Sequence, residues 1–105
     1  MEINKQLAEE FSLKPFQVEN TVKLIDEGNT IPFIARYRKE ATGSLDDQVL
    51  RELADRLSYL RNMDETREKI KAAIEEQGAL TDELSAALDA AKTLTELDDI
   101  YRPFK

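Results

Sequence analysis

Residues that commonly carry catalytic chemistry are scarce in this chain, which contains neither histidine nor cysteine. Their absence removes the commonest general base, the thiol nucleophile and most ligands of transition metals. The remaining candidates are four adjacent acidic pairs, whose residue types suit a hard metal ion or acid–base catalysis. They are Asp46–Asp47, Asp64–Glu65, Glu75–Glu76 and Asp98–Asp99.

Adjacent residues on a helix diverge by about 100°, so the two carboxylates of such a pair do not converge on one ion. We therefore interpret all four pairs as solvated surface. The chain also lacks a glycine-rich phosphate-binding loop. We expect no catalytic residue, no metal site and no cofactor, and we predict that the chain is not an enzyme.

The second chemically capable group is a cluster of cations around an aromatic ring, formed by Arg36, Tyr37, Arg38 and Lys39. One interpretation is nucleic-acid contact, in which the cations bind phosphates and the ring stacks on a base. Another is architectural: on a helical wheel Arg38 falls on the apolar side, where an arginine packs its stem and binds helix-end carbonyls or a carboxylate. A third is docking against other domains, because arginine and aromatic residues are common in interface hot spots. We favour the architectural interpretation.

Few breaks interrupt the helical patterns that must position these residues. Three glycines, three prolines and the apolar spacing predict an irregular all-α fold of about six helices, organised around one long helix. The predicted ranges are 4–11, 15–28, 30–43, 45–77, 81–92 and 95–103.

Predicted N-terminal caps mark several of these starts. Thr30 and Thr81 each precede a helical pattern, and their side chains are suited to accept a hydrogen bond from the first turn. Ser44 with Asp47 resembles a capping box. Thr95 is the predicted start of the last helix.

The long helix carries leucines at 50, 53, 57 and 60, and its apolar stripe is interrupted at Arg67. The regular pattern is too short for a self-associating coiled coil, so we interpret the leucines as core. About thirty residues at about 1.5 Å each exceed the diameter of a small domain. The helix must therefore break near residues 62–64 or extend beyond its own domain, and we favour a continuous helix.

The amino-acid composition indicates which kinds of partner the chain can bind. The 105 residues carry a net charge of -7, which argues against strong autonomous binding of nucleic acid. No apolar run approaches the roughly 20 residues of a membrane span, and the chain has no cysteine for a disulfide framework. We expect one cytoplasmic domain with no membrane partner.

The segment at 30–46, TIPFIARYRKEATGSLD, resembles the hallmark of the N-terminal region of the Tex family of bacterial transcription accessory proteins. Shorter stretches resemble the same family on both sides of it, so the resemblance covers essentially the whole chain. These are QVE at 17–19, LIDEG at 24–28, LSYLR at 57–61, IEEQG at 74–78, LTEL at 94–97 and DIYRPFK at 99–105.

The resemblance implies a piece of a much longer cytoplasmic protein that binds nucleic acid mainly through an S1-type RNA-binding domain outside these residues. Residues 1–105 would then be an N-terminal helical scaffold whose partners are the other domains, with at most weak direct contact to RNA or DNA. Tyr101 and Phe104 would pack against another domain. The alternative is a protein-interaction module that recruits a transcription or translation partner through its acidic surface and long helix.

Overall fold

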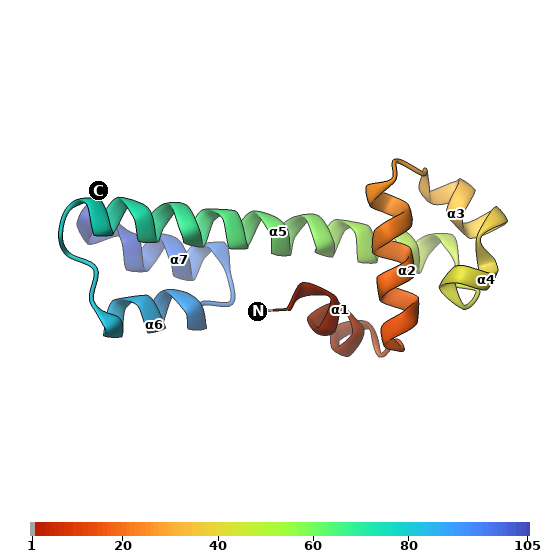
Figure 1. Ribbon diagram of the computed structural model, residues 1–105, viewed down its shortest axis with the longest axis horizontal. Helices are drawn as coiled ribbons and strands as arrows, with labels where there is room; N and C mark the ends of the chain where they lie inside the picture. Colours follow the sequence, from red (N-terminus) through yellow and green to blue (C-terminus); the bar gives the residue numbers. More distant parts are fainter. Residues whose placement is uncertain (1) are drawn as a thin grey trace. The chain divides into compact units, whose positions relative to one another are not determined.

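A computed structural model describes residues 2–105, and all regular structure within them is helical, which confirms the predicted fold class (Figure 1). The elements are α1 (Ile3–Phe11), α2 (Pro15–Asp26), α3 (Ile31–Tyr37), α4 (Lys39–Thr42), α5 (Asp47–Glu76), α6 (Asp82–Ala90), α7 (Leu94–Tyr101) and the 3₁₀ helix η1 (Arg102–Phe104). They form two compact units, one ending at Leu60 and the other running from Arg61 to Lys105. No helix among the described residues is both long and apolar enough to cross a membrane.

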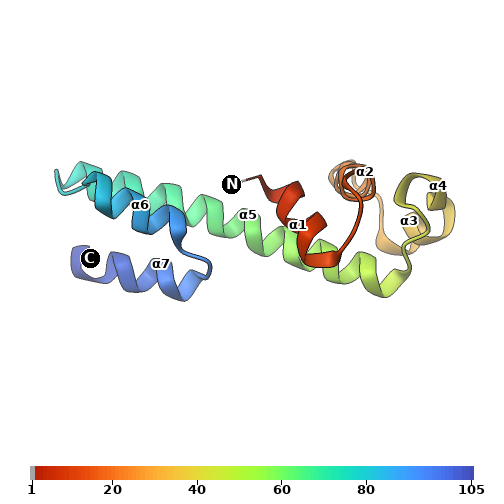
Figure 2. The same cartoon turned by 90° about the horizontal axis from the view of Figure 1, so that it is seen from below.

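The first unit is built around a cluster of leucine and valine side chains. α1 contributes Leu7 and Ala8, α2 contributes Val18 and Val22, and the start of α5 contributes Leu53, Leu57 and Leu60. α2 runs across α5 rather than along it (Figures 1 and 2). The leucine stripe is therefore buried within the chain, as predicted.

The predicted helix at 30–43 is broken, and this prediction of one continuous element is wrong. α3 ends at Tyr37, Arg38 adopts φ -128° and ψ 36°, and the separate short helix α4 follows. Side chains of α2 hold the second piece in place. Gln17 Nε2 donates to the Thr42 carbonyl at 2.9 Å, and Asn20 Nδ2 donates to the Ala41 carbonyl at 2.9 Å. These amides satisfy carbonyls at the end of α4 that have no partner within the helix.

Gly43 makes this contact possible. Its φ is +70°, and a Cβ at this position would lie 2.6 Å from Gln17 Nε2. A side chain would therefore be strained by the backbone and would collide with the amide that binds Thr42.

Two of the predicted N-caps are confirmed and two are wrong. Thr30 Oγ1 accepts from Phe33 N, and Thr81 Oγ1 accepts from Leu84 N.

At α5, Ser44 has φ 64° and is too early to cap, so the cap is Asp46, whose Oδ1 accepts from Val49 N at 2.9 Å. The last helix begins earlier than predicted, because Thr93 rather than Thr95 caps it through Glu96 N at 3.0 Å.

α5 is one continuous helix of 30 residues, as predicted. Asp47 and Arg51, an acid four residues before a base on this helix, form an ion pair at 3.0 Å. Glu52 and Arg56 have the same spacing but form no ion pair, because the Arg56 guanidinium binds both carboxylate oxygens of Glu10 on α1, at 2.8 and 3.0 Å.

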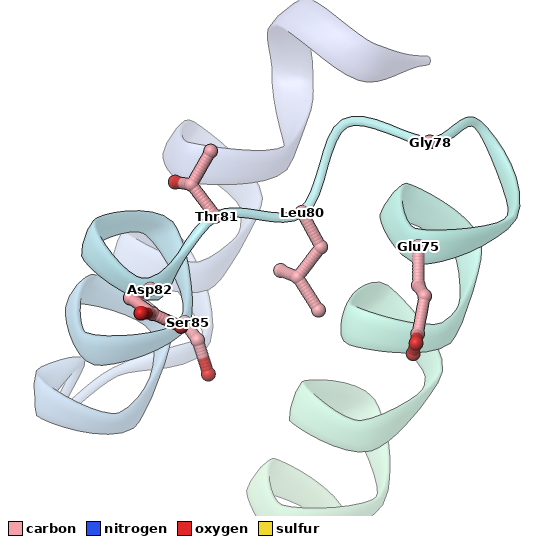
Figure 3. Close-up of a pocket in the computed structure, with 6 residues that line it drawn as sticks. All are labelled: Glu75, Gly78, Leu80, Thr81, Asp82 and Ser85. Carbon is pink, nitrogen blue, oxygen red and sulfur yellow. The ribbon is translucent and has the colours of Figure 1, made fainter.

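In the second unit, α6 returns along the second half of α5 and α7 reverses direction again (Figures 1 and 2). Its buried apolar residues are Met63, Ile70, Ile74, Leu88, Ala91 and Leu97. Between α5 and α6 the chain turns at Gly78, next to a hollow of about 360 Å³. Figure 3 shows Glu75 and Asp82 at this hollow on separate helices, with the Leu80 side chain projecting between them.

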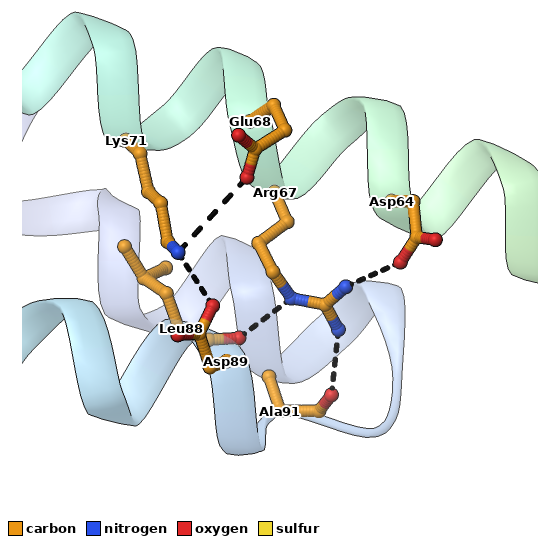
Figure 4. A network of polar contacts seen from close by, with 7 residues as sticks. All are labelled: Asp64, Arg67, Glu68, Lys71, Leu88, Asp89 and Ala91. Atoms are coloured by element: carbon orange, nitrogen blue, oxygen red, sulfur yellow. Dashed lines mark hydrogen bonds and ion pairs between the residues drawn. The ribbon is translucent and has the colours of Figure 1, made fainter. Parts of the chain in front are cut away.

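Arg67 is the buried polar centre of this unit, with only 8% of the residue exposed. Its Nε donates to the Leu88 carbonyl at 2.8 Å and its Nη2 to the Ala91 carbonyl at 3.0 Å, while Nη1 binds Asp64 at 2.6 Å (Figure 4). The arginine thus supplies donors and positive charge to the C-terminal end of α6, where the Leu88 carbonyl also accepts from Ala91 N at 3.3 Å. Beside it, Lys71 pairs with Asp89.

Candidate nucleic-acid interface

Two of the predicted cations, Arg36 and Arg38, lie at the two ends of a pair of aromatic rings on the surface. The Arg38 guanidinium lies 5.3 Å from the centre of the Phe33 ring, which lies 5.3 Å from the Tyr37 ring. The Arg36 guanidinium lies 5.5 Å from the other end of this series, the Tyr37 ring. We call Phe33, Arg36, Tyr37 and Arg38, together with Lys39, the cation–aromatic ladder.

Local sequence explains how α3 presents the ladder. Pro32 lies in the first turn, where its missing N–H costs nothing. Phe33 and Tyr37 are four residues apart and therefore share a face. Ile34, which is next to Phe33 in the sequence and so points about 100° away from it, is fully buried, while Tyr37 is 55% exposed. The aromatic side of this short helix therefore faces outward.

The cations of the ladder have no carboxylate partner within residues 2–105. Arg36, Arg38 and Lys39 are all exposed, and none of them forms an ion pair among the described residues. By contrast, Arg51, Arg56, Arg67 and Arg102 each pair with a carboxylate. The segment 30–43 holds three cations and the single carboxylate of Glu40. It is a local positive site in an acidic chain, suited to bind phosphates.

Arg38 shows part of what the architectural interpretation predicted. Its Nη1 donates to the Tyr37 carbonyl at the end of α3, at 3.0 Å. Its side chain is nevertheless exposed rather than packed among apolar residues. Because α3 ends before Arg38, the helical wheel that placed it on the apolar side does not apply.

Tyr101 and Phe104 are both half-buried in the second unit. The Tyr101 ring helps to line a hollow of about 400 Å³ with Ile70, and the Lys105 ammonium lies 5.7 Å from its centre. The Phe104 carbonyl accepts a hydrogen bond from Gln77 Nε2 at 2.8 Å. Packing of these two aromatic side chains against another domain stays a prediction.

Several of the acidic residues from the adjacent pairs make structural contacts instead of converging on an ion. Asp46 caps α5 and Asp47 pairs with Arg51, so these neighbours have separate partners. Asp98 binds Lys105 and Arg102, and the hydrogen bond from Lys105 is the main cause of its lowered pKa. Among residues 2–105 there is no group of three or more acidic side chains arranged to hold a metal ion.

The residues that join the helices through polar contacts were not predicted from the sequence. Arg67 was interpreted only as an interruption of the apolar stripe, although an arginine in an apolar register is itself a signal of a buried charge with partners. Gln17 and Asn20, which hold α4, carried no such signal. The same is true of Glu10, whose pKa is lowered chiefly by its hydrogen bond from Arg56.

Comparison with known proteins agrees with the predicted resemblance. The sequence profile of the Tex-like protein N-terminal domain matches residues 1–75. Protein YhgF of Escherichia coli is 56% identical over 99 residues, which cover 94% of this chain and 13% of that protein. The transcriptional accessory protein Tex of Neisseria gonorrhoeae is 50% identical over 105 residues, covering 100% of this chain and 14% of that protein.

A human relative, S1 RNA-binding domain-containing protein 1, is 34% identical over 99 residues, covering 94% of this chain and 10% of that protein. The chain thus spans only about one seventh or less of the length of these relatives. The family profile nevertheless matches well over half of it, and the relatives align along nearly all of it. The chain therefore belongs to the Tex-like protein family and contains its N-terminal domain.

Proposed function

We propose that this chain is a non-enzymatic helical scaffold of a cytoplasmic transcription accessory protein, and that it also makes a weak direct contact to nucleic acid. The printed names of relatives support the setting: one is a transcriptional accessory protein and another contains an S1 RNA-binding domain. The direct contact is carried by one observation, the exposed cation–aromatic ladder with its unpaired cations.

The ladder has the parts that single-stranded nucleic acid needs. Three exposed cations within four consecutive residues can contact the phosphates of a strand, and the exposed Tyr37 ring offers a stacking surface for a base. Three phosphate contacts predict that log K falls with log salt with a slope of about -2 for a single strand. The net charge of -7 opposes this attraction, so binding is expected near the weak end of non-specific affinity, at about 10⁻⁴ M.

Fluorescence anisotropy of a labelled single-stranded oligonucleotide, titrated with the 105-residue chain at low salt, tests the contact. Replacing Arg36, Arg38 and Lys39 by glutamine is expected to abolish binding and its salt dependence. Tyr37→Leu keeps every charge and removes the stacking surface. It is expected to weaken binding about fivefold or more, since stacking on an aromatic ring is worth about 1–3 kcal/mol per base.

A matched control separates this site from net charge. Lys5, Lys14 and Lys23 are exposed lysines of the same unit, and replacing them by glutamine changes the net charge by the same amount. If the cation–aromatic ladder is the binding site, this lysine control variant is expected to bind with nearly the original affinity. Equal losses in the two triple variants, or no binding by the unaltered chain at about 10⁻⁴ M, would remove the direct contact and leave only the scaffold role.

The scaffold role is tested in a full-length protein of the family. Deleting the region that corresponds to residues 1–105 is expected to accelerate amide hydrogen exchange in the remaining domains, because they lose the surface that orders them. Unchanged exchange throughout those domains would refute the scaffold role.

A further inference from the structure

A shallow groove of about 480 Å³ lies in the first unit, between α1 and the first half of α5. We call it the acidic–aromatic groove. Its lining residues are Glu10, Phe11, Glu52, Asp55, Arg56 and Tyr59. It is separate from the cation–aromatic ladder, with which it shares no residue.

The single cation of the groove is already neutralised. Arg56 Nε and Nη2 bind the two carboxylate oxygens of Glu10 at 2.8 and 3.0 Å, and this hydrogen bonding is the main cause of the lowered pKa of Glu10 and the raised pKa of Arg56. The carboxylates of Glu52 and Asp55 form no ion pair within residues 2–105. Glu52 accepts one hydrogen bond from the neutral amide of Gln48 at 3.1 Å. Two negative charges at the rim therefore stay without a counter-charge.

These two carboxylates face the same way, because Glu52 and Asp55 are three residues apart on α5. Beside them, the half-buried Phe11 and Tyr59 supply apolar walls. One guanidinium already packs on a ring of this groove: that of Arg56 lies 5.2 Å from the centre of the Tyr59 ring.

We propose that the acidic–aromatic groove binds an arginine side chain from a basic segment of a partner protein. A guanidinium has the planar donors that match carboxylates, and its flat face and aliphatic stem pack on aromatic rings. The charge complementarity excludes nucleic acid from the same place, because its phosphates are repelled by Glu52 and Asp55. The groove thus has a different type of partner from the ladder, and its occupation does not depend on the proposed nucleic-acid contact.

The test uses the peptide acetyl-Gly-Arg-Gly-Arg-Gly-amide as the probe, titrated into the 105-residue chain at physiological salt and followed by NMR. The proposal predicts chemical-shift changes at the Phe11 and Tyr59 rings and at the carboxylates of Glu52 and Asp55. A second peptide with citrulline in place of arginine keeps the shape and removes the charge, and it is expected to cause no such changes. Shifts confined to other parts of the chain, or equal binding of the two peptides, would overturn the proposal.

Charge-matched variants separate the groove from the general acidity of the chain. The double variant Glu52→Gln, Asp55→Asn is expected to weaken binding about five- to tenfold. The control Glu75→Gln, Glu76→Gln removes the same charge from exposed residues of the second unit and is expected to change affinity by less than about twofold. Equal weakening by the two double variants would show that net charge alone attracts the peptide, and would refute the groove. A single-stranded oligonucleotide that shifts the same groove signals would also refute it.

Discussion

Arg67→Met tests whether a buried guanidinium, beyond apolar packing, holds α6 against α5 in the second unit. The side chain is only 10% exposed and reaches from α5 to two carbonyls at the end of α6. Methionine has a similar length and suits an apolar environment, but it carries no donor. The substitution therefore removes the hydrogen bonds and keeps most of the volume.

The magnitude follows from the contacts shown in Figure 4. A hydrogen bond from a charged donor contributes about 1.5–3 kcal/mol, so the bonds to Leu88 and Ala91 together contribute about 3–6 kcal/mol. Burying the methionine side chain returns about 1.5–3 kcal/mol. The Asp64 carboxylate is 41% exposed, and its pair with Arg67 adds little because water screens it. Taking the middle of both ranges, the net loss is about 2 kcal/mol, a large part of the roughly 5–15 kcal/mol that stabilises a typical domain.

The assay combines urea unfolding, followed by far-UV circular dichroism, with amide hydrogen exchange resolved by residue. We expect the unfolding free energy to fall by the stated amount and exchange to accelerate most in α6. Arg67→Lys keeps the charge, but a single ammonium does not reproduce the planar fork that binds both carbonyls. It is expected to lose about 1–2 kcal/mol, since a large share of the hydrogen bonding goes.

Arg51→Met is the matched control on the same helix. Arg51 also pairs with an aspartate, but its side chain is 56% exposed, so the loss should stay below about 0.5 kcal/mol. The reasoning is refuted if Arg67→Met costs no more than Arg51→Met. Wild-type stability in Arg67→Lys would also contradict it, because the bonds to both carbonyls would then be unnecessary.

Three other substitutions test single contacts of the first unit by urea unfolding. Thr21→Val should stabilise the chain by about 1 kcal/mol, because the Thr21 hydroxyl is fully buried and has no hydrogen-bond partner among residues 2–105. Gly43→Ala should destabilise it by about 2–3 kcal/mol, from left-handed backbone strain and the displaced Gln17 amide. Glu10→Gln should cost about 0.5–1 kcal/mol at neutral pH through the lost pair with Arg56. Because the pKa of Glu10 is lowered by folding, its contribution is present above the ordinary carboxyl pKa and disappears as the pH falls through the folded value.

Each of these predictions has an outcome that contradicts it. A loss of stability in Thr21→Val would mean that the hydroxyl has a favourable role in the fold. Gly28 is the control for Gly43, because its φ is also positive, at +91°, but a Cβ there would have no described neighbour within 4 Å other than adjacent backbone. Equal costs at the two glycines would exclude the contact with Gln17. A difference between Glu10→Gln and wild type that persists at a pH below the folded pKa would show that charge pairing is not its source.

The helix ends that depend on local chemistry could be predicted from the sequence. Thr30 and Thr81 are followed by helical patterns, and both cap as expected, because the hydrogen bond to the first turn involves only neighbouring residues. Where two candidates compete within a few residues, the local signal is not enough. Thr93 and Thr95 both precede acidic residues at the required spacing, and only the fold selects Thr93.

The break at Arg38 could not be predicted, because no residue between Ile31 and Thr42 other than Pro32 disfavours a helix strongly. The cause lies in another helix. Gln17 and Asn20 bind the carbonyls at the end of α4 and fix that turn against α2, which an uninterrupted α3 does not reproduce in this fold. Tertiary contacts therefore override the local preference of this segment.

Tertiary contacts also decide which charged side chains of the candidate site are paired, and this could not be predicted from the sequence. The sequence shows the residue types of the ladder, a tyrosine among three cations. It does not show whether each cation has a carboxylate partner in the fold. The spacing of Glu52 and Arg56, four residues apart on one helix, favours a pair between them. In the fold Arg56 binds Glu10 instead, which leaves Glu52 without a counter-charge among residues 2–105. Which cations and carboxylates stay unpaired is decided only when distant segments meet. The ladder and the acidic–aromatic groove are therefore both products of how the first unit folds: packing pairs some charges and leaves others on the surface for partners of opposite sign.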